Sequence, residues 1–129
     1  MAEGEGLLSI PATTAFIREN ARAGRFVSYG QVADANGAEW AQVRRAMGRH
    51  LLHVCAAALA EGGPMVSAVV VNRTHLATGD MDEGTLAGFL ASARELGLTW
   101  EDGRAFLRAQ QRATFAWAGA EGVGSAPHG

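Results

Sequence analysis

Apolar and polar residues alternate along this chain with a period close to that of an α-helix over most of its length. The pattern predicts five helices, at residues 11–23, 28–36, 39–60, 83–96 and 100–117. Ser28 and Gln31 have the spacing of a capping box, so the second helix should begin at this serine. The pair Asn36-Gly37 tolerates the backbone of a sharp turn, which separates the second helix from the third.

The third predicted helix divides its side chains between two faces. At 100° per residue, an apolar stripe is formed by Val43, Met47, Leu51, Val54 and Ala58. A polar stripe on the opposite side is formed by Gln42, Arg45, Arg49 and His53. We expect the apolar stripe to pack against the core and the polar stripe to face solvent or a partner.

A β-branched segment follows the third helix, after a break at residues 62–64. Residues 65–71 are predicted to form a strand, and residues 75–78 a short returning strand, which together make a β-hairpin. Three helices followed by a hairpin is the order of a winged helix-turn-helix. The predicted fold class is therefore mainly α with a small β-hairpin: a winged helix-turn-helix with two additional C-terminal helices.

The 129 residues suffice for one domain with one hydrophobic core. We divide them into a flexible N-terminus (1–10), a winged helix-turn-helix (11–80), a C-terminal helical extension of the same domain (81–118) and a flexible tail (119–129). The last helix carries Phe106, Phe115 and Trp117, which either close the core or supply a dimer interface.

Charge is distributed unevenly along the chain. Thirteen acidic residues and eleven basic residues, every one an arginine, give a formal net charge of −2, which excludes nonspecific coating of a polyanion by the whole surface. Residues 40–79 nevertheless carry a net charge of +3 between flanks of −2 and −3, and residues 40–60 contain no carboxylate. Such an arginine patch suits phosphates and guanine edges, although a polar helix stripe is also typical of a merely solvated face.

The sequence offers little that could catalyse a reaction. Cys55 is the only cysteine, which excludes an intramolecular disulfide, and its apolar surroundings predict a small buried hydrophobe. His50 and His53 have no carboxylate or thiolate at ligand spacing, so no metal site is expected. The start of the chain lacks the pattern of a signal peptide, and no segment is apolar enough for a membrane span. We therefore expect a cytoplasmic protein with no membrane contact, no cofactor and no catalytic residue.

Trp40, Trp100 and Trp117 each lie near the end of a predicted helix. A tryptophan at such a position typically seals a hydrophobic core. Stacking on nucleobases is an alternative that needs basic surroundings, which only Trp40 has.

Several short motifs between residues 25 and 80 resemble those of a known family. They are Arg25-Phe-Val-Ser-Tyr-Gly-Gln-Val-Ala33, Asn36-Gly37, Val43-Arg-Arg-Ala-Met-Gly48, Val69-Val-Val-Asn72 and Ala77-Thr-Gly79. Together they resemble the C-terminal DNA-binding domain of the O6-alkylguanine-DNA alkyltransferases and of the related alkyltransferase-like proteins. The resemblance implies that Tyr29 helps to rotate a nucleotide out of the duplex and that Arg45 fills the gap left in the base stack.

The active-site motif of that family is missing from this chain. The family has Pro-Cys-His-Arg-Val ahead of the wing, with tryptophan or alanine replacing the cysteine in its non-catalytic branch, whereas this chain has Pro64-Met-Val-Ser-Ala-Val69. The nucleophile and its histidine and arginine neighbours are absent, and Cys55 lies too early in the sequence to replace the nucleophile. The resemblance therefore implies the scaffold and its groove-facing helix without alkyl transfer.

The sequence thus predicts a non-catalytic protein that binds duplex DNA, with its third helix in the major groove. Gln42, Arg45 and Arg49 are predicted to face the groove. Ser28, Tyr29, Arg44 and Arg73 are predicted to contact the DNA backbone or to act from the wing. Two alternatives stay open. One is a protein-interaction adaptor or accessory subunit that uses the acidic C-terminal helices, with a protein partner or as a homodimer; the other is an alkyltransferase-like sensor of damaged DNA.

Overall fold

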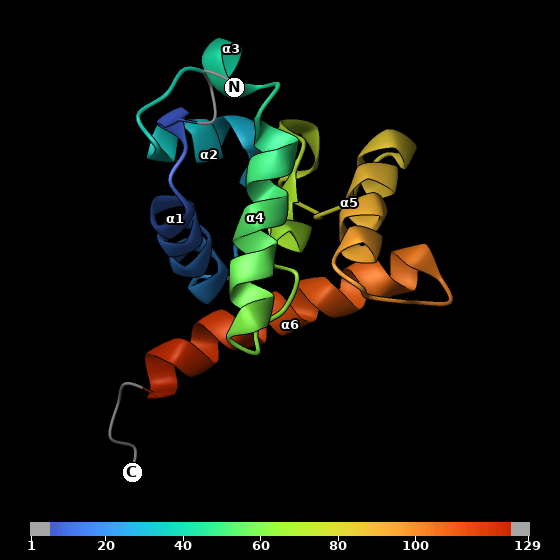
Figure 1. The fold of residues 1–129 in the computed structure, drawn as a ribbon. Helices are drawn as coiled ribbons and strands as arrows, with labels where there is room; N and C mark the ends of the chain where they lie inside the picture. Colours follow the sequence, from blue (N-terminus) through green and yellow to red (C-terminus); the bar gives the residue numbers. More distant parts are fainter. Residues whose placement is uncertain (1–5, 125–129) are drawn as a thin grey trace.

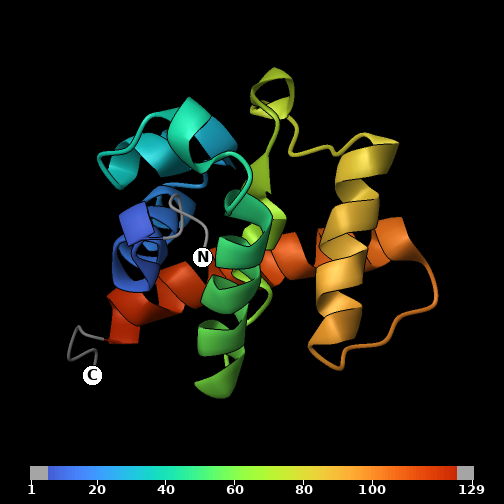
Figure 2. The same ribbon diagram turned by 45° about the horizontal axis from the view of Figure 1, so that its top comes forward.

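The computed structural model describes residues 6–124, with side chains from 6 to 119, as six α-helices around a very small sheet (Figure 1). The helices are α1 (Ile10–Arg22), α2 (Tyr29–Ala35), α3 (Trp40–Val43), α4 (Met47–Ala60), α5 (Glu83–Glu95) and α6 (Gly103–Gly124). The short elements are the strands β1 (Val27–Ser28) and β2 (Val70–Val71) and the 3-10 helices η2 (Val66–Val69) and η3 (Arg73–His75). Helix α4 stands in the middle, with α1 and α2 on one side and α5 on the other, while α6 crosses beneath them (Figures 1 and 2).

The mainly helical class is confirmed, but the predicted β-hairpin is wrong. Strand β2 pairs in parallel with β1, with Val70 opposite Val27 and Val71 opposite Ser28. Residues 75–78 form no strand, because the chain turns there and Gly79 N donates to His75 O at 2.8 Å. A hairpin wing exposes one face, whereas three consecutive valines of the segment 69–71 are fully buried, as in a strand covered on both faces. Within residues 6–124 the structure therefore has no hairpin wing.

The third predicted helix, at residues 39–60, is divided into two helices. Residues 44–46 form a turn between α3 and α4, so the first four helical residues lie apart from the rest. The two predicted stripes are nevertheless confirmed. All five residues of the apolar stripe are at most 7% exposed, and the four residues of the polar stripe are exposed. The spacing of apolar residues at 39–60 therefore predicted which side chains are buried, although these residues do not form one continuous helix.

The beginning of α2 follows the predicted capping box. Gln31 N donates to Ser28 Oγ at 3.1 Å, and Ser28 N donates to Gln31 Oε1 at 2.9 Å. Helices α1 and α5 lie within a residue of their predicted bounds. Helix α6 continues to Gly124 instead of ending near residue 117, so residues 119–124 of the predicted tail are helical. The rest of that tail, 125–129, and residues 1–5 of the predicted flexible N-terminus lie outside the described residues.

Helix α6 holds the centre of the molecule through two adjacent glutamines. Gln110 Oε1 accepts from Met65 N at 2.9 Å. The side chain of Gln111 is buried, and its Nε2 donates to Ala68 O at 3.0 Å and to Gly79 O at 2.7 Å. These bonds satisfy backbone groups of η2 and of the loop after η3, which have no regular ladder to satisfy them. The final helix is therefore part of the core and closes it from below.

A small polar network ties α1, α2 and α4 together inside the core. Thr13 Oγ1 and His50 Nε2 lie 2.7 Å apart, and Asn36 Nδ2 donates to Thr13 Oγ1 at 3.0 Å. Asn36 Oδ1 in turn accepts from Ser9 N at 2.7 Å. Because buried polar groups need partners, this chain of bonds fixes the end of α2 against α1 and α4. The second helix, which carries part of the candidate site, is thereby positioned.

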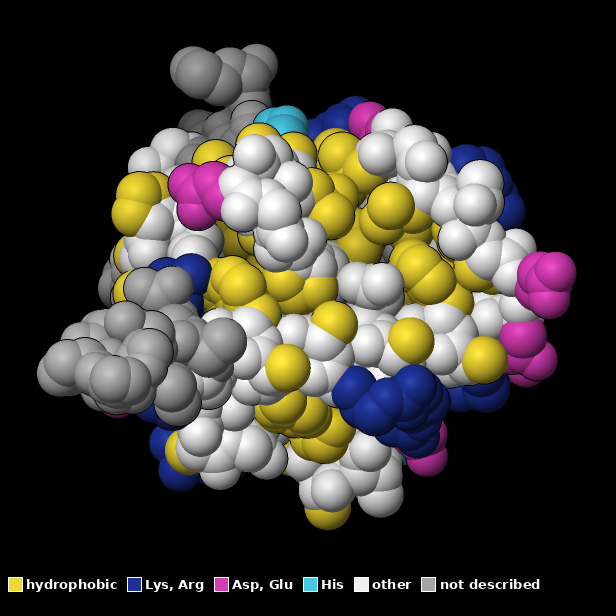
Figure 3. All heavy atoms as spheres, turned by 90° about the horizontal axis from the view of Figure 1, so that it is seen from below, with side chains coloured by type: hydrophobic (Ala, Val, Ile, Leu, Met, Phe, Trp, Pro, Cys, Tyr) yellow, Lys and Arg dark blue, Asp and Glu magenta, His cyan; other side chains and the backbone are white. Residues whose placement is uncertain are grey.

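The underside of the molecule, where α6 crosses, is largely apolar. Figure 3 shows hydrophobic side chains spread over this face, interrupted by a patch of arginine. Phe115 packs edge-on against Phe26 with ring centroids 5.2 Å apart, and Trp100 stacks on Phe106 at 5.1 Å. Leu107 is 1% exposed. The aromatic residues of the last helix thus contribute to closing the core.

Candidate functional site

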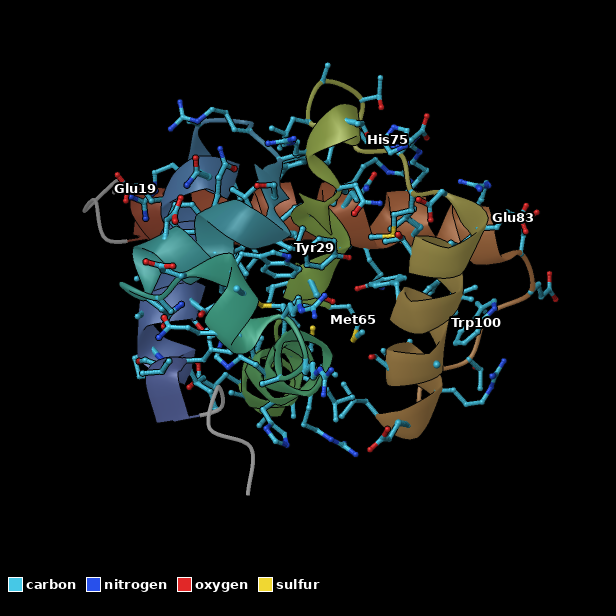
Figure 4. The ribbon with its side chains drawn as sticks, turned by 90° about the horizontal axis from the view of Figure 1, so that it is seen from above. Glu19, Tyr29, Met65, His75, Glu83 and Trp100 are labelled. Carbon is cyan, nitrogen blue, oxygen red and sulfur yellow. The ribbon has the colours of Figure 1, made fainter. Side chains whose placement is uncertain are left out.

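Two neighbouring pockets lie on the side of the molecule away from α6. The inner pocket, of about 350 Å³, lies between α4 and α5, and the outer pocket, of about 580 Å³, lies against the start of α2 and η3. Both pockets are lined by Tyr29, Trp40 and Asn72. In Figure 4 Tyr29 lies near the middle of this view, and His75 marks the outer loop of η3. We call the surface formed by Tyr29, Trp40, Arg44, Asn72 and Arg73 the pocket face.

The inner pocket is lined by apolar residues, by polar residues and by glycines, which have no side chain to fill it. The apolar residues are Met47, Leu51, Met81 and Phe89, and the polar ones are Ser67, Asn72, Thr85 and Ser92. Gly48 on α4 and Gly84 and Gly88 on α5 line it as well. A Cβ atom built on Gly48 or Gly88 would meet nothing within 4 Å, so these two glycines leave open space. A pocket of this character suits a flat, largely apolar ligand with hydrogen-bonding edges.

Tyr29 begins α2 and keeps its phenol proton over a wide pH range. Burial raises the pKa of the Tyr29 phenol, and the negative charge of Asp82 raises it further. Asp82 caps α5, and the pKa of its carboxyl group is lowered, first by the hydrogen bond from Thr85 N at 2.8 Å. Asn72 Nδ2 donates to Asp82 Oδ2 and to Thr85 Oγ1, each at 3.1 Å. Asn72 therefore joins the end of β2 to the start of α5 at the edge of the inner pocket.

The structure brings two of the predicted arginines together. Arg44 lines the inner pocket and Arg73 the outer one, and both pockets share the same aromatic pair. Both guanidinium groups are exposed, and within the described residues neither forms a hydrogen bond or an ion pair. Arg45 is also exposed, on the turn between α3 and α4, but lines neither pocket.

Three other predicted site residues are engaged within the fold. Ser28 lines the outer pocket, but it is only 6% exposed and its hydroxyl group caps α2. Gln42 is exposed, and its Oε1 accepts from Glu39 N at 3.0 Å at the start of α3. Arg49 pairs with Glu95 of α5 at 2.8 Å, so this arginine is neutralised by another helix. The sequence showed only that α4 itself lacks a carboxylate.

Sequence reasoning missed part of the pocket face. Trp40, for which the sequence left a core-sealing and a base-stacking role open, does not seal a core, because it is 43% exposed and lines both pockets. The inner pocket is also lined by Ser67, within the segment 65–71 that was expected to be a plain strand, and by Asn72 directly after it. The available signal was the glycine content of the two helical segments, since Gly48 and Gly88 interrupt otherwise good helix-forming sequence.

Cys55 is a buried hydrophobe, as predicted. Its side chain has no exposed surface, and burial raises the pKa of the thiol. The thiol donates to Ser67 Oγ at 3.2 Å, and Ser67 N donates to the sulfur at 3.4 Å. A buried, neutral thiol whose residue lines neither pocket is a poor nucleophile.

Two arginines of α6 hold the loop between η3 and α5, which carries Thr78, Asp80 and Met81. Arg104 donates to Met81 O at 3.0 Å, and Arg108 donates to Thr78 O at 3.1 Å and pairs with Asp80. Together with Gln111 these residues form what we call the α6 anchor. Of the acidic residues in the second half of the chain, Asp80 is thus paired with an arginine of α6.

Searches against protein-family models, curated proteins and solved structures find no match for this chain. The family resemblance therefore rests on the sequence motifs alone. Across residues 6–124, none of the helices is both long and apolar enough to cross a membrane. Histidine, cysteine, aspartate and glutamate side chains form no group of three able to hold a metal ion in the same part of the chain.

Proposed function

We propose that the protein binds duplex DNA without catalysing a reaction on it, and that the pocket face is the contact surface. The observation that carries this proposal is that Arg44 and Arg73, from segments far apart in sequence, line two pockets that share Tyr29, Trp40 and Asn72. Both lie beside the same aromatic pair, and neither has an acidic partner in the part of the chain that the structure describes. Free guanidinium groups at one surface suit the phosphates of a nucleic-acid backbone.

The helices α2, α3 and α4 supply a helix-turn-helix arrangement for this contact. Arg44 and Arg45 lie on the turn directly before α4, close to the end at which a helix entering the major groove makes its base and phosphate contacts. Arg73 on η3 takes the place that a hairpin wing has in the predicted fold. Arg49 contributes less than the sequence predicts, because its pair with Glu95 has to open first.

The test is a salt titration of binding to a duplex of ~20 base pairs. Affinity should fall steeply between about 50 and about 200 mM salt, because phosphate contacts release counterions. The double substitution Arg44→Ala and Arg73→Ala should lower the affinity and reduce the salt slope by about two. Arg112→Ala, which removes an exposed arginine from α6, should leave both unchanged. No binding by the unaltered protein at about 50 mM salt would refute the proposal.

The inner pocket supports a second candidate function: an alkyltransferase-like sensor that recognises a modified base in DNA. Its size, its apolar lining residues and its position beside Tyr29 suit a base turned out of the duplex. The protein should then bind a duplex containing O6-methylguanine more tightly than the unmodified duplex. Gly88→Leu, which fills the open space at that glycine, should abolish the preference while leaving binding to unmodified DNA intact. Equal affinity of the unaltered protein for both duplexes would exclude the sensor function.

A further inference from the structure

The three tryptophans of this protein differ in whether a guanidinium group covers the indole ring. Trp117 is covered by Arg18, whose guanidinium carbon lies 4.1 Å from the ring centroid, and Trp100 by Arg94 at 5.1 Å. Both of these rings are only partly exposed. Trp40 is 43% exposed, and within the described residues no guanidinium lies over its ring. Two tryptophans thus have an internal cationic cover, and the third has an open face.

Trp40 is held at the boundary of the two pockets. It is the first residue of α3, and its ring centroid lies 6.4 Å from that of Tyr29 with an interplanar angle of 41°. This contact supports one side of the indole, and the remaining surface faces the space between the pockets. A single exposed aromatic ring is common on protein surfaces, but this one is bordered by two pockets and by the arginines that line them.

The charges around Trp40 indicate which ligand suits this position. Arg44 is a lining residue of the inner pocket and Arg73 of the outer one, with Trp40 shared between them. An aromatic platform flanked by free guanidinium groups is the arrangement that binds an unstacked base and its neighbouring phosphates. An apolar peptide would leave both arginines unpaired, and a simple anion would not use the indole face.

We propose that Trp40 is the stacking platform for a nucleobase that is unpaired, with Arg44 and Arg73 binding the phosphates on either side of it. This role rests on the proposed DNA binding and makes it more specific, since the protein should prefer DNA with an unpaired base to a continuous duplex. Base stacking on an aromatic side chain accounts for roughly a 5- to 100-fold change in affinity.

The test compares Trp40→Phe with Trp40→Leu in the full chain. Both side chains are apolar and both keep the packing against Tyr29, but only phenylalanine retains an aromatic face. The probes are two duplexes of the same sequence, one fully paired and one with a single bulged 2-aminopurine, whose fluorescence is quenched when it stacks on an aromatic ring. Trp100→Phe is the control, because that tryptophan is covered by Arg94 and lies in neither pocket.

The unaltered protein should bind the bulged duplex roughly 5- to 100-fold more tightly and quench the 2-aminopurine in the complex. Trp40→Phe and Trp100→Phe should retain most of the preference. Trp40→Leu should bind both duplexes equally and leave the 2-aminopurine bright at saturation. If Trp40→Leu keeps both the preference and the quenching, Trp40 is not the platform although DNA binding stands. If the unaltered protein binds neither duplex, the proposed function fails, and this role of Trp40 fails with it.

Discussion

Arginine has opposite uses on two sides of this molecule. In the α6 anchor, Arg104 and Arg108 donate to backbone carbonyl groups, and Arg108 also pairs with Asp80. On the pocket face, Arg44 and Arg73 are exposed and, among the described residues, without a partner. The comparison shows that the number of arginines in a segment says little about its function, because what matters is whether the fold has already satisfied them.

Glycine differs between the same two regions. Gly79, in the loop held by the α6 anchor, has a φ of +74°, and a Cβ there would lie 2.2 Å from Phe26 Cζ. Gly88, in the middle of α5, has an ordinary helical backbone and open space in front of it. The first glycine is required by the fold. The second weakens its helix and leaves room in the inner pocket.

The largest effect is expected from Gly79→Ala. The added methyl group collides with the ring of Phe26, which packs edge-on against Phe115, and the backbone is also in the left-handed region. We expect the free energy of unfolding to fall by about 3 kcal/mol, measured by urea denaturation. A loss below about 1 kcal/mol would mean that the loop is not held as rigidly as the anchor implies.

Gln111→Met should have the next largest effect. Methionine fills a similar volume but leaves the carbonyl groups of Ala68 and Gly79 without the donor they have now. The free energy of unfolding should fall by about 2 kcal/mol, because buried acceptors lose their partners. Arg112→Ala at the next, exposed position is the matched control and should change stability by less than about 0.5 kcal/mol. Equal effects of the two substitutions would contradict the anchoring role of Gln111.

Gly88→Ala should act in the opposite direction. Alanine is the better helix former, and its methyl group meets no atom within 4 Å. We expect a gain of about 0.5–1 kcal/mol in the free energy of unfolding, read from the same urea curves. Gly48→Ala on α4 tests the same point on the opposite wall of the pocket. Destabilisation by either substitution would show that these glycines are needed for packing and would remove the contrast with Gly79.

The smallest effect concerns the pH dependence of stability. The folded-state pKa of Asp82 is lowered, so its ionised carboxylate stabilises the fold above the unfolded-state pKa, near 4, and this contribution is lost as the pH falls through the lower folded value. Asp82→Asn keeps a capping oxygen but does not titrate. Between about pH 6 and about pH 3 the urea midpoint of the unaltered protein should therefore fall further than that of the variant. Parallel curves would show that this cap contributes nothing through its charge.

Local sequence signals predicted those parts of the fold that depend on neighbouring residues. The capping box of Ser28 and Gln31 and the buried stripe from Val43 to Ala58 both follow from contacts within a few residues. The valine-rich segment was misread because its partner is Val27, far back in the sequence. A continuous buried run is typical of a parallel strand, and this pattern argued against a hairpin with one exposed face.

The candidate site was predictable only in part, for the same reason. Arg44, Arg73 and Tyr29 were identified from charge and from motifs, whereas the pairing of Arg49 with Glu95 depends on how α5 packs beside α4. Trp40 lies on α3, which a turn at residues 44–46 separates from α4, and the helical period does not reveal this turn. Whether an arginine lines a pocket or is paired with another helix depends on packing in three dimensions, which a linear pattern does not contain.

The two glutamines of α6 have a consequence for how the chain folds as it is made. The amide of Met65 and the carbonyl groups of Ala68 and Gly79 are bonded by a helix that begins only at residue 103. Synthesis proceeds from the N-terminus at about 5–20 residues per second, so the middle of the chain is complete for seconds before its last partner exists. These backbone groups therefore gain their partners only after residues 110 and 111 of α6 have been made, so the first helices alone cannot complete this part of the core.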